Sequence, residues 1–363
     1  MSYYNQQRVT GKHYSMNIST SKAIVLERPR RAQLREIKLT EITRSSIVCR
    51  TRLSAVSSGT DMKTWRGQQH PEQCYYPLVP GYENMGIVEY VGPDTDTGLK
   101  TGDRVMINEC RLFGDVCAAW GGNTLYAIKN RETASSPFDY PVKIPDEVCD
   151  KDAVLAYLAC VSLKGAKRFS FRKEETILVT GAGMIGISAI QILKLLNPSA
   201  KVICIDRSPF RREIAAHYAD CVLHGNGSEL EKIREFTNGR MADKVMECTG
   251  NSEIVGTLHK YIKDGGWGHD DEPAHIHLQG DYPEPIIMDS WHRWFCKNCT
   301  VTMSCALAPG CKEQILQWMS EGKFSTAHLP VEIWPAAQCH EAFAYKEAKG
   351  ENVFKILFDW SGE

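Results

Sequence analysis

Residues 176–197 constrain the fold more than any other part of the chain. They begin with a short apolar run, TILVT, continue through the glycine-rich sequence GAGMIG, and end in a long apolar stretch, ISAIQILKLLN. The short run favours a buried strand, and the longer stretch has the length of a helix. The segment therefore predicts a strand, a tight turn and a helix in direct succession.

The glycines of this turn each meet a different steric need. Gly181 permits the tight turn, Gly183 lets the backbone approach a pyrophosphate, and Gly186 lets the helix and strand pack closely. Met184 and Ile185 complete the turn, where the helix N-terminus faces the phosphates. The segment therefore predicts a dinucleotide-binding site.

The ends of the following strands provide further candidate cofactor residues. The strand KVICID ends in Asp206, at the distance where a carboxylate accepts both ribose hydroxyls of the adenosine half. Such a carboxylate repels a 2′-phosphate and favours NAD, whereas Arg207 could pair with that phosphate and leaves NADP open. Later strand ends add Cys248, Thr249, Gln279 and Gly280, the last two next to the nicotinamide carboxamide.

The composition is that of a globular protein whose partners are small molecules. A chain of 363 residues exceeds one ordinary hydrophobic core, so two domains are expected. The net charge of -1 provides no general attraction for nucleic acid or an anionic membrane, and we expect neither as a partner. We expect a cytoplasmic location, because the polar N-terminus lacks the apolar centre of a secretory signal and no membrane-spanning run follows.

The character of the sequence changes along the chain and divides it into four parts. Residues 1–20 form a polar leader, and residues 21–155 hold short β-prone runs broken by glycine and proline. Residues 156–310 alternate apolar strands with helical patterns, which predicts a doubly wound parallel sheet. Residues 311–363 return to mixed segments. The predicted fold class is α/β, with a β-rich domain beside the parallel sheet.

Several segments, in their order along the chain, resemble the medium-chain dehydrogenases and reductases, a family that includes zinc alcohol and polyol dehydrogenases. These segments are SSGTDMKTWRG, VPGYENMGIVEYVG, TGDRV, WGGNTLYAIKN and VMECTGN. The resemblance implies a GroES-like catalytic domain over residues 21–155, an inserted Rossmann domain over 156–310, and a return to the catalytic domain over 311–363. Relatives often dimerise through the nucleotide domain, and a homodimer is left open because no residue of the sequence decides it.

Zinc relatives hold a catalytic metal through Cys, His and a third ligand, and these positions differ here. The cysteine position is Ser58, the histidine position is Tyr82, and the third position falls at about Ala156. Only Glu83 remains, and one carboxylate does not hold Zn²⁺, so we expect no catalytic metal. The VPGYE segment also resembles a smaller branch with the bacteriochlorophyllide hydroxyethyl dehydrogenases and zinc-free enzymes of specialised metabolism.

The structural zinc of the family is expected to be missing as well. That site needs four closely spaced cysteines after the Gly-Asp-Arg-Val turn, and only Cys110 and Cys117 follow it here. We interpret both as buried or surface thiols, and Cys160 as a core residue.

Some side chain must take over the proton chemistry of the missing metal. Tyr82 could donate a phenolic proton if a nearby cation lowers its pKa. Lys63 and Thr60 match relay positions of the relatives, while Asp61 and Glu83 would orient these groups or stabilise positive charge. The candidate catalytic residues are therefore Ser58, Thr60, Asp61, Lys63, Tyr82 and Glu83.

A purely structural interpretation of the same residues stays open. In it, Tyr82 fills the space left by zinc and histidine, with its hydroxyl on Glu83. Lys63 is then a solvated surface lysine, and Ser58 and Thr60 only shape a turn.

Residues and resemblance together predict a zinc-independent, NAD(P)-dependent dehydrogenase. It would interconvert a secondary alcohol and a ketone on a polyfunctional small molecule, such as a sugar, a cyclitol or a biosynthetic intermediate. One alternative is a reductase of an activated C=C or C=N bond, which needs no metal because its substrate is already electrophilic. Another is a non-enzymatic NAD(P)-binding sensor or structural protein that kept the fold.

Overall fold

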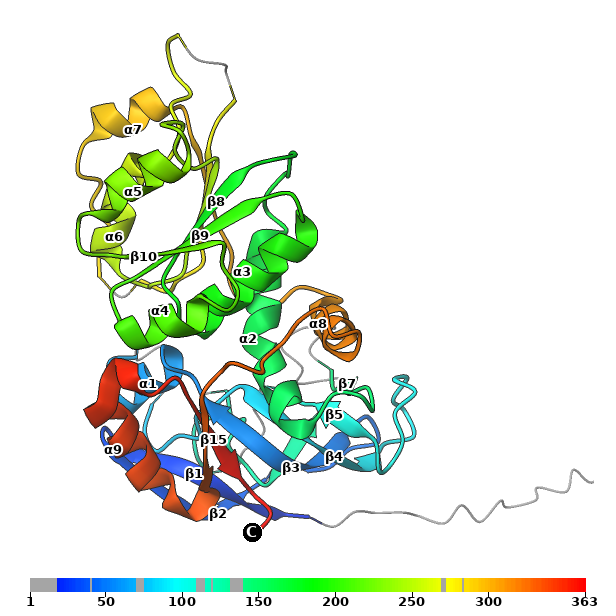
Figure 1. The fold of residues 1–363 in the computed structure, drawn as a ribbon. Helices are drawn as coiled ribbons and strands as arrows, with labels where there is room; N and C mark the ends of the chain where they lie inside the picture. The colour runs from blue at the N-terminus through cyan, green and yellow to red at the C-terminus, as the bar shows by residue number, and fades with distance from the viewer. Residues whose placement is uncertain are drawn as a thin grey trace, which may run out of the picture.

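The computed structural model describes most of the chain and divides it into an upper and a lower half (Figure 1). Most of the predicted leader, residues 1–17, lies outside the described residues, as does Cys110. The described ranges are 18–39, 41–69, 75–108, 115–118, 120–130, 140–268, 272–282 and 284–363.

The upper half contains a six-stranded sheet in which every strand pair is parallel. The order of the strands along the chain reverses between β8 and β11, and ligands bind outside the carboxyl ends of strands at such a switch point. The predicted doubly wound parallel sheet is therefore confirmed. In spatial order, the strands are β10 (Cys221–His224), β9 (Lys201–Asp206), β8 (Thr176–Thr180), β11 (Lys244–Glu247), β12 (His275–Leu278) and β13 (Thr300–Met303).

Helices connect these strands and cover the sheet (Figure 1). The longest of the connecting helices follows the glycine turn directly, as the sequence predicts, and its buried side is mostly apolar, with Ser188 and Gln191 as its polar members. The helices of this half are α3 (Met184–Leu196), α4 (Pro209–Ala215), α5 (Glu229–Phe236), α6 (Ser252–Thr257) and α7 (Trp291–Lys297), with a short 3₁₀ turn at Leu258–Lys260.

The lower half is the predicted GroES-like, β-rich part. Its main sheet has seven strands. Two of them, β14 and β15, come from the C-terminal end of the chain, and β15 pairs antiparallel with β3. The strands are β14 (Val331–Pro335), β15 (Lys355–Asp359), β3 (Ile47–Val56), β4 (Glu83–Val91), β5 (Arg104–Met106) and β7 (Val142–Lys143), with β6 (Tyr126–Lys129) on β3 and a separate hairpin of β1 (Thr20–Arg28) and β2 (Arg31–Lys38).

Three helical segments of the lower half carry residues that matter for the site. Helix α1 (Thr60–Arg66) follows β3, and α9 (Cys339–Lys349) lies beside the β1–β2 hairpin. The 3₁₀ turn η3 (Gly350–Asn352) joins α9 to the last strand, and a second such turn, η2 (Ala336–Gln338), precedes α9.

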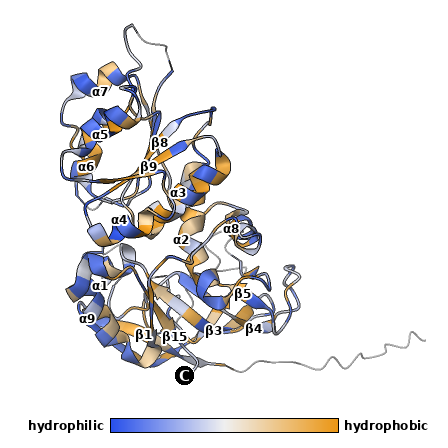
Figure 2. Cartoon of the chain, viewed as in Figure 1, coloured by the Kyte–Doolittle hydropathy of each residue, from blue (hydrophilic) through white to orange (hydrophobic). Residues whose placement is uncertain are grey.

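Helix α2 (Asp150–Ala166) connects the two halves and packs against α3, α8 (Cys311–Ser320), β3 and β4. Most of its residues are apolar, as Figure 2 shows, and it is therefore buried around most of its circumference. The helix runs across the predicted boundary at residues 155 and 156, while the predicted boundary at 310 falls just before α8. The division into domains stays a prediction.

Two further properties of the described residues concern helix hydropathy and the cysteines. None of their helices combines the length and hydropathy needed to cross a membrane. Cys160, Cys204, Cys311 and Cys339 are buried thiols without disulfide partners, packed as small apolar side chains.

Candidate active site

The glycine turn lies at the carboxyl end of β8, beside the switch point of the sheet. Gly181 has φ of 88°, a left-handed conformation that favours glycine. A methyl group on Gly186 would lie 1.8 Å from the carbonyl oxygen of Gly181, so helix and turn require a glycine there. A methyl group on Gly183 would find its nearest neighbour, Arg211 Nη1, at 3.9 Å, so this position faces open space. Met184 and Ile185 form the first turn of α3.

Asp206 is fixed against the glycine turn. It is the last residue of β9, and its carboxylate accepts hydrogen bonds from the backbone N–H of Ala182 at 2.7 Å and of Ser208 at 2.8 Å. Asp206 is only 8% exposed, and these two hydrogen bonds fix its carboxylate beside the glycine turn. Arg207 follows it, but its guanidinium turns to Glu351 of η3 in the lower half.

The end of β11 is built around a buried carboxylate that the sequence analysis did not single out. Glu247 accepts a hydrogen bond from the backbone N–H of Thr249 at 2.7 Å and from the hydroxyls of Thr249 and Tyr282. Burial and the neighbouring carboxylate hold the pKa of the Cys248 thiol well above its usual range. Cys248 is therefore a neutral wall residue of the site.

Gln279 and Gly280 follow β12, and of these two residues Gly280 lies against the turn that follows β11. A methyl group on Gly165 of α2 would lie 1.9 Å from Gln279 Oε1, so the Gln279 side chain points toward α2. Gly280 lies against Gly250, because a methyl group there would come within 2.8 Å of the Gly250 Cα.

Arg211 is a cation at the glycine turn that the sequence analysis missed. It lies in the first turn of α4, and its Nη1 is the atom nearest to the open face of Gly183. Among the described residues its buried Nε has no hydrogen-bond partner. A guanidinium with a free Nε donor beside a glycine turn fits a phosphate group. The only sequence signal was its spacing, five residues after Asp206.

Tyr82 lies in the lower half, in the loop before β4, and is 9% exposed. Its hydroxyl donates a hydrogen bond to Ser57 Oγ at 2.6 Å and lies 3.4 Å from Thr60 Oγ1. Its ring packs against Tyr157 of α2, with 5.0 Å between ring centroids, and meets the edge of Trp120. The sequence analysis pointed to Ser58, whereas the buried Ser57 makes the contact and Ser58 is exposed.

The expectation that a cation lowers the pKa of Tyr82 is wrong. Burial raises the pKa of this phenol far above its usual value, and the nearby carboxylates of Asp61 and Glu83 raise it further. The alternative contact with Glu83 is also not formed, because the phenol donates to Ser57. Tyr82 therefore stays protonated at neutral pH.

Asp61 and Glu83 are structural partners of the backbone and of a lysine. Asp61 accepts hydrogen bonds from the N–H groups of Ser57 at 2.7 Å and Gly81 at 3.0 Å, and burial raises its pKa to about 7. Glu83 forms a buried ion pair with Lys355 of β15, and both side chains are at most 1% exposed. Asp61 thus shapes the turn that carries Ser57, and Glu83 is neutralised.

Lys63 joins the two halves of the molecule. Its Nζ donates to Asp281 Oδ2 at 2.9 Å and to the carbonyl oxygen of the same residue at 3.3 Å. Asp281 follows Gly280 in the upper half. The structure therefore shows no direct contact between Lys63 and Tyr82 that would form the predicted relay. Lys63 instead connects α1 of the lower half to Asp281 of the upper half.

The residues at the family's metal positions do not fit zinc. Ser58 is exposed, the Tyr82 hydroxyl donates a hydrogen bond to Ser57, and Ala156 has no ligand atom. Cys160 lies in the core and bonds to the carbonyl oxygen of Ala156 at 3.1 Å. Within the described ranges, no group of three or more His, Cys, Asp or Glu side chains is arranged to hold a metal ion.

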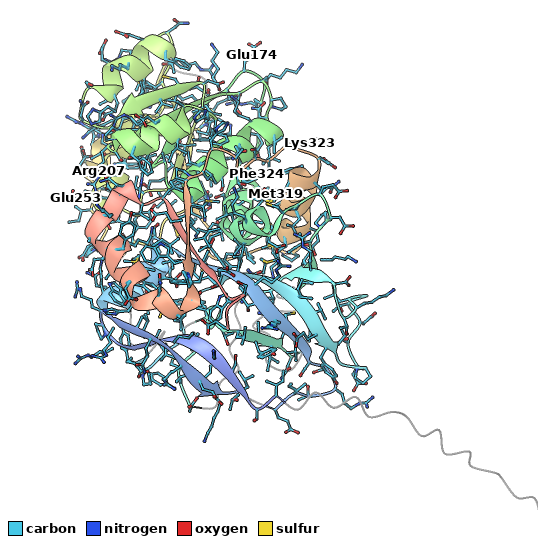
Figure 3. All side chains as sticks on the ribbon, turned by 60° about the horizontal axis from the view of Figure 1, so that its bottom comes forward. Glu174, Arg207, Glu253, Met319, Lys323 and Phe324 are labelled. Atoms are coloured by element: carbon cyan, nitrogen blue, oxygen red, sulfur yellow. The ribbon has the colours of Figure 1, made fainter. Side chains whose placement is uncertain are left out.

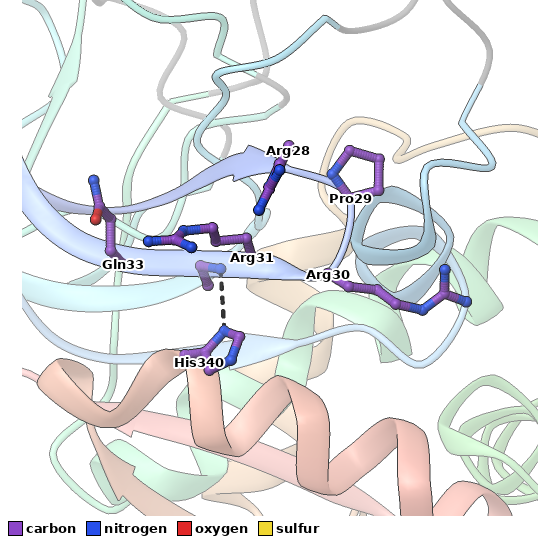
Figure 4. A pocket seen from close by; sticks show the side chains of 7 residues that line it. Arg28, Pro29, Arg30, Arg31, Gln33 and His340 are labelled. Atoms are coloured by element: carbon purple, nitrogen blue, oxygen red, sulfur yellow. Dashed lines mark hydrogen bonds between the residues drawn. The ribbon is translucent and has the colours of Figure 1, made fainter.

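A surface hollow lies elsewhere, on the β1–β2 hairpin (Figure 4). His340 of α9 closes one side, where its Nδ1 accepts a hydrogen bond from the N–H of Ala32 at 3.4 Å. None of the predicted site residues lines this hollow, so it is separate from the crevice. Its other lining residues are Arg28, Pro29, Arg30, Arg31 and Gln33.

Comparisons with known proteins agree with both halves of the fold. Residues 45–136 match the alcohol dehydrogenase GroES-like domain, and residues 185–267 match the zinc-binding dehydrogenase family. An alcohol dehydrogenase of Geobacillus stearothermophilus is 28% identical over 338 residues, which cover 89% of this chain and 95% of that protein. The 2-desacetyl-2-hydroxyethyl bacteriochlorophyllide A dehydrogenase of Cereibacter sphaeroides is 24% identical over 345 residues, covering 93% and 98%.

A solved structure shares the whole fold. The crystal structure of a short chain alcohol dehydrogenase from Escherichia coli, complexed with NADH, superposes with a TM-score of 0.77 at 21% identity and covers 94% of this chain and 100% of that one. The family matches and the relatives indicate an alcohol dehydrogenase or oxidoreductase of the medium-chain type, and the solved structure shares its fold.

Proposed function

We propose that the protein uses NAD to interconvert a secondary alcohol and a ketone on a polyfunctional small molecule, such as a sugar, a cyclitol or a biosynthetic intermediate, without catalytic zinc. The observation that carries the proposal is the combination of two sites. A glycine turn with the buried carboxylate of Asp206 fits a dinucleotide. A cluster of hydroxyls around Tyr82 fits proton transfer to an oxygen.

The choice of NAD rests on the surroundings of Asp206. Its carboxylate is fixed by two backbone N–H groups, and a fixed negative charge disfavours a 2′-phosphate. Arg211 supports binding of the pyrophosphate, because its charge faces the open side of Gly183. Structures similar to this one were solved with NADH, from Escherichia coli, and with NADP, from Sinorhizobium meliloti, so the choice rests on Asp206.

We propose the absence of zinc because the side chains at the family's three metal-ligand positions are poor zinc ligands. Zinc sites need thiolate, imidazole or free carboxylate ligands, and this chain offers two hydroxyls and a methyl group at the three positions. The remaining carboxylate, Glu83, is bound to Lys355. Protein hydroxyls must therefore handle the proton that zinc helps to release in zinc-dependent relatives.

Tyr82 is the proposed proton donor in ketone reduction. When bound, NADH supplies the hydride. The developing alkoxide is more basic than a phenolate, so even a phenol with a raised pKa can protonate it. The hydroxyls of Ser57 and Thr60, which Tyr82 contacts, then relay a proton taken up from solvent back to the Tyr82 phenolate. Because Tyr82 starts protonated, it serves carbonyl reduction better than alcohol oxidation.

The test is a Tyr82→Phe variant assayed with NADH and a panel of ketoses and cyclic ketones. We expect turnover to fall roughly 10²–10⁴-fold, while the Kd of NADH stays at the wild-type value. Tyr90→Phe, on β4 and away from the hydroxyl cluster, serves as the matched control. Metal analysis of the purified protein should find far less than one zinc per chain.

Three results would each overturn a different part of the proposal. Stoichiometric zinc would remove the zinc-free mechanism, and the absence of NADH binding would remove the cofactor site. Turnover with enones or imines, but not with ketones, would favour the alternative reductase.

Assembly and location are also proposed. Strand β13 is an edge of the parallel sheet, and its Val301 and Met303 are 41% and 67% exposed. Exposed apolar side chains on an unpaired edge favour association, and we propose a homodimer through this edge. We propose the cytoplasm as the location, where buried thiols such as Cys160 and Cys204 stay reduced.

A further inference from the structure

Arg207 and Glu351 form an ion pair between the two halves, beside the proposed adenosine site. The Nε of Arg207 donates to Glu351 Oε1 at 2.8 Å, and Nη2 contacts the same oxygen. Arg207 follows Asp206 at the end of β9, whereas Glu351 belongs to η3 at the C-terminal end of α9. Figure 3 shows Arg207 where the upper half meets the end of α9.

In this ion pair, Glu351 binds the Arg207 guanidinium, which could otherwise bind the 2′-phosphate of NADP. A guanidinium one residue after the ribose carboxylate is suited to a 2′-phosphate, and both ligands compete for the same donor atoms. Arg207 thus lies between two carboxylates, Asp206 and Glu351. The first repels the phosphate directly, and the second occupies the group that would attract it.

We propose that Glu351 is a specificity-determining residue that favours NAD over NADP by holding Arg207 away from the ribose 2′ position. This inference rests on the proposed function, because it requires a dinucleotide at the glycine turn. NADP binding must break the ion pair, while NAD binding leaves it intact. The device combines residues that are 144 positions apart, one from each half.

The expected effect is moderate, because the pair is solvent-exposed. The side chains of Arg207 and Glu351 are 74% and 38% exposed, and exposed ion pairs of this kind change affinities by up to about fivefold. We therefore expect Glu351→Gln to increase NADPH affinity relative to NADH by up to about fivefold at low salt.

The experiment is a double-mutant cycle on cofactor binding, which needs no substrate. The Kd values of NADH and NADPH are measured by cofactor fluorescence for the wild type, Glu351→Gln, Arg207→Ala and the double variant. Glu231→Gln is the matched control, because it removes the same charge from an exposed pair with Arg234 on α5. Only the ratio of the two Kd values is diagnostic, since general damage to the fold would weaken both cofactors alike.

The inference requires that Glu351→Gln shifts the ratio toward NADPH, that Arg207→Ala in the same chain cancels the shift, and that Glu231→Gln leaves the ratio unchanged. An unchanged ratio in Glu351→Gln, or an equal shift without Arg207, would overturn it. If the wild type binds neither cofactor, the proposed function fails instead.

Discussion

At the scale of single residues, the lower half contains a buried lysine that has no carboxylate partner among the residues that the structure describes. Lys346 of α9 is 3% exposed and donates to the carbonyl oxygens of Val353 at 3.2 Å and Phe354 at 3.5 Å. Burial, with the nearby positive charges of Lys355 and Arg211, lowers its pKa to about 7. Lys346 therefore changes its charge near neutral pH.

Lys346→Met should flatten the pH dependence of stability above neutrality. An unfolded lysine binds its proton up to about pH 10.4, whereas folded Lys346 releases it near pH 7. Between these values the unfolded state binds more protons, so this residue makes the free energy of unfolding rise with pH by up to about 1.4 kcal/mol per unit. Urea unfolding from pH 6.5 to 9.5 measures the slope, and the exposed Lys349→Met is the control. Equal slopes in wild type and Lys346→Met would contradict the assignment.

Ser57 and Ser58 offer a matched pair of substitutions at the hydroxyl cluster. Ser57 is buried and accepts the Tyr82 hydrogen bond, whereas Ser58 is exposed. Ser57→Ala should lower kcat for ketone reduction about tenfold, the loss expected for one hydrogen bond of about 1.4 kcal/mol. Ser58→Ala should retain nearly wild-type kcat. Steady-state assays decide between them, and a larger loss for Ser58→Ala would place the proton path elsewhere.

At the scale of elements, the sequence predicted correctly those structures that depend on contacts between residues close together in the chain. The strand, glycine turn and helix of residues 176–197 appear as β8, the turn and α3, because their steric needs are met within a few residues. The partners of Lys63 and Arg207 could not be predicted, since each lies in the other half, 218 and 144 positions away. The lowered pKa predicted for Tyr82 was wrong for the same reason, because the burial that raises this pKa depends on elements far away in the sequence.

The glycine turn allows folding and cofactor binding to be separated. Gly186→Ala should destabilise the protein by at least about 1–3 kcal/mol, because its methyl group meets the Gly181 carbonyl oxygen. Gly183→Ala should fold with nearly wild-type stability, since its methyl group meets open space, yet bind NADH roughly tenfold more weakly by obstructing the pyrophosphate. Thermal unfolding and NADH titration measure both. Equal stability losses, or undiminished NADH binding by Gly183→Ala, would argue against this use of the turn.

At the scale of the whole molecule, the two halves are joined by α2 and by two ion pairs at the crevice. Lys63 with Asp281 and Arg207 with Glu351 each connect the upper to the lower half. The crevice is thus bridged at the ends of two strands of the parallel sheet, β12 and β9. Partly exposed ion pairs are weak, so breaking these two pairs to admit a cofactor costs little energy, while the buried contacts of α2 hold the halves together.

Strand β13 forms the outer edge of the sheet in the upper half. β13 pairs with β12 on one side only, and its exposed Val301 faces solvent in a single chain. If two copies pair along this edge, Val301→Lys buries a charge in each partner and should convert a dimer into a monomer in sedimentation equilibrium. Ile333→Lys is the control, because Ile333 is 53% exposed on β14, an edge strand of the other half. Both variants should bind NADH, since neither lies at the glycine turn. A wild-type monomer at all concentrations, or a dimer that Ile333→Lys alone disrupts, would assign the apolar edge another role.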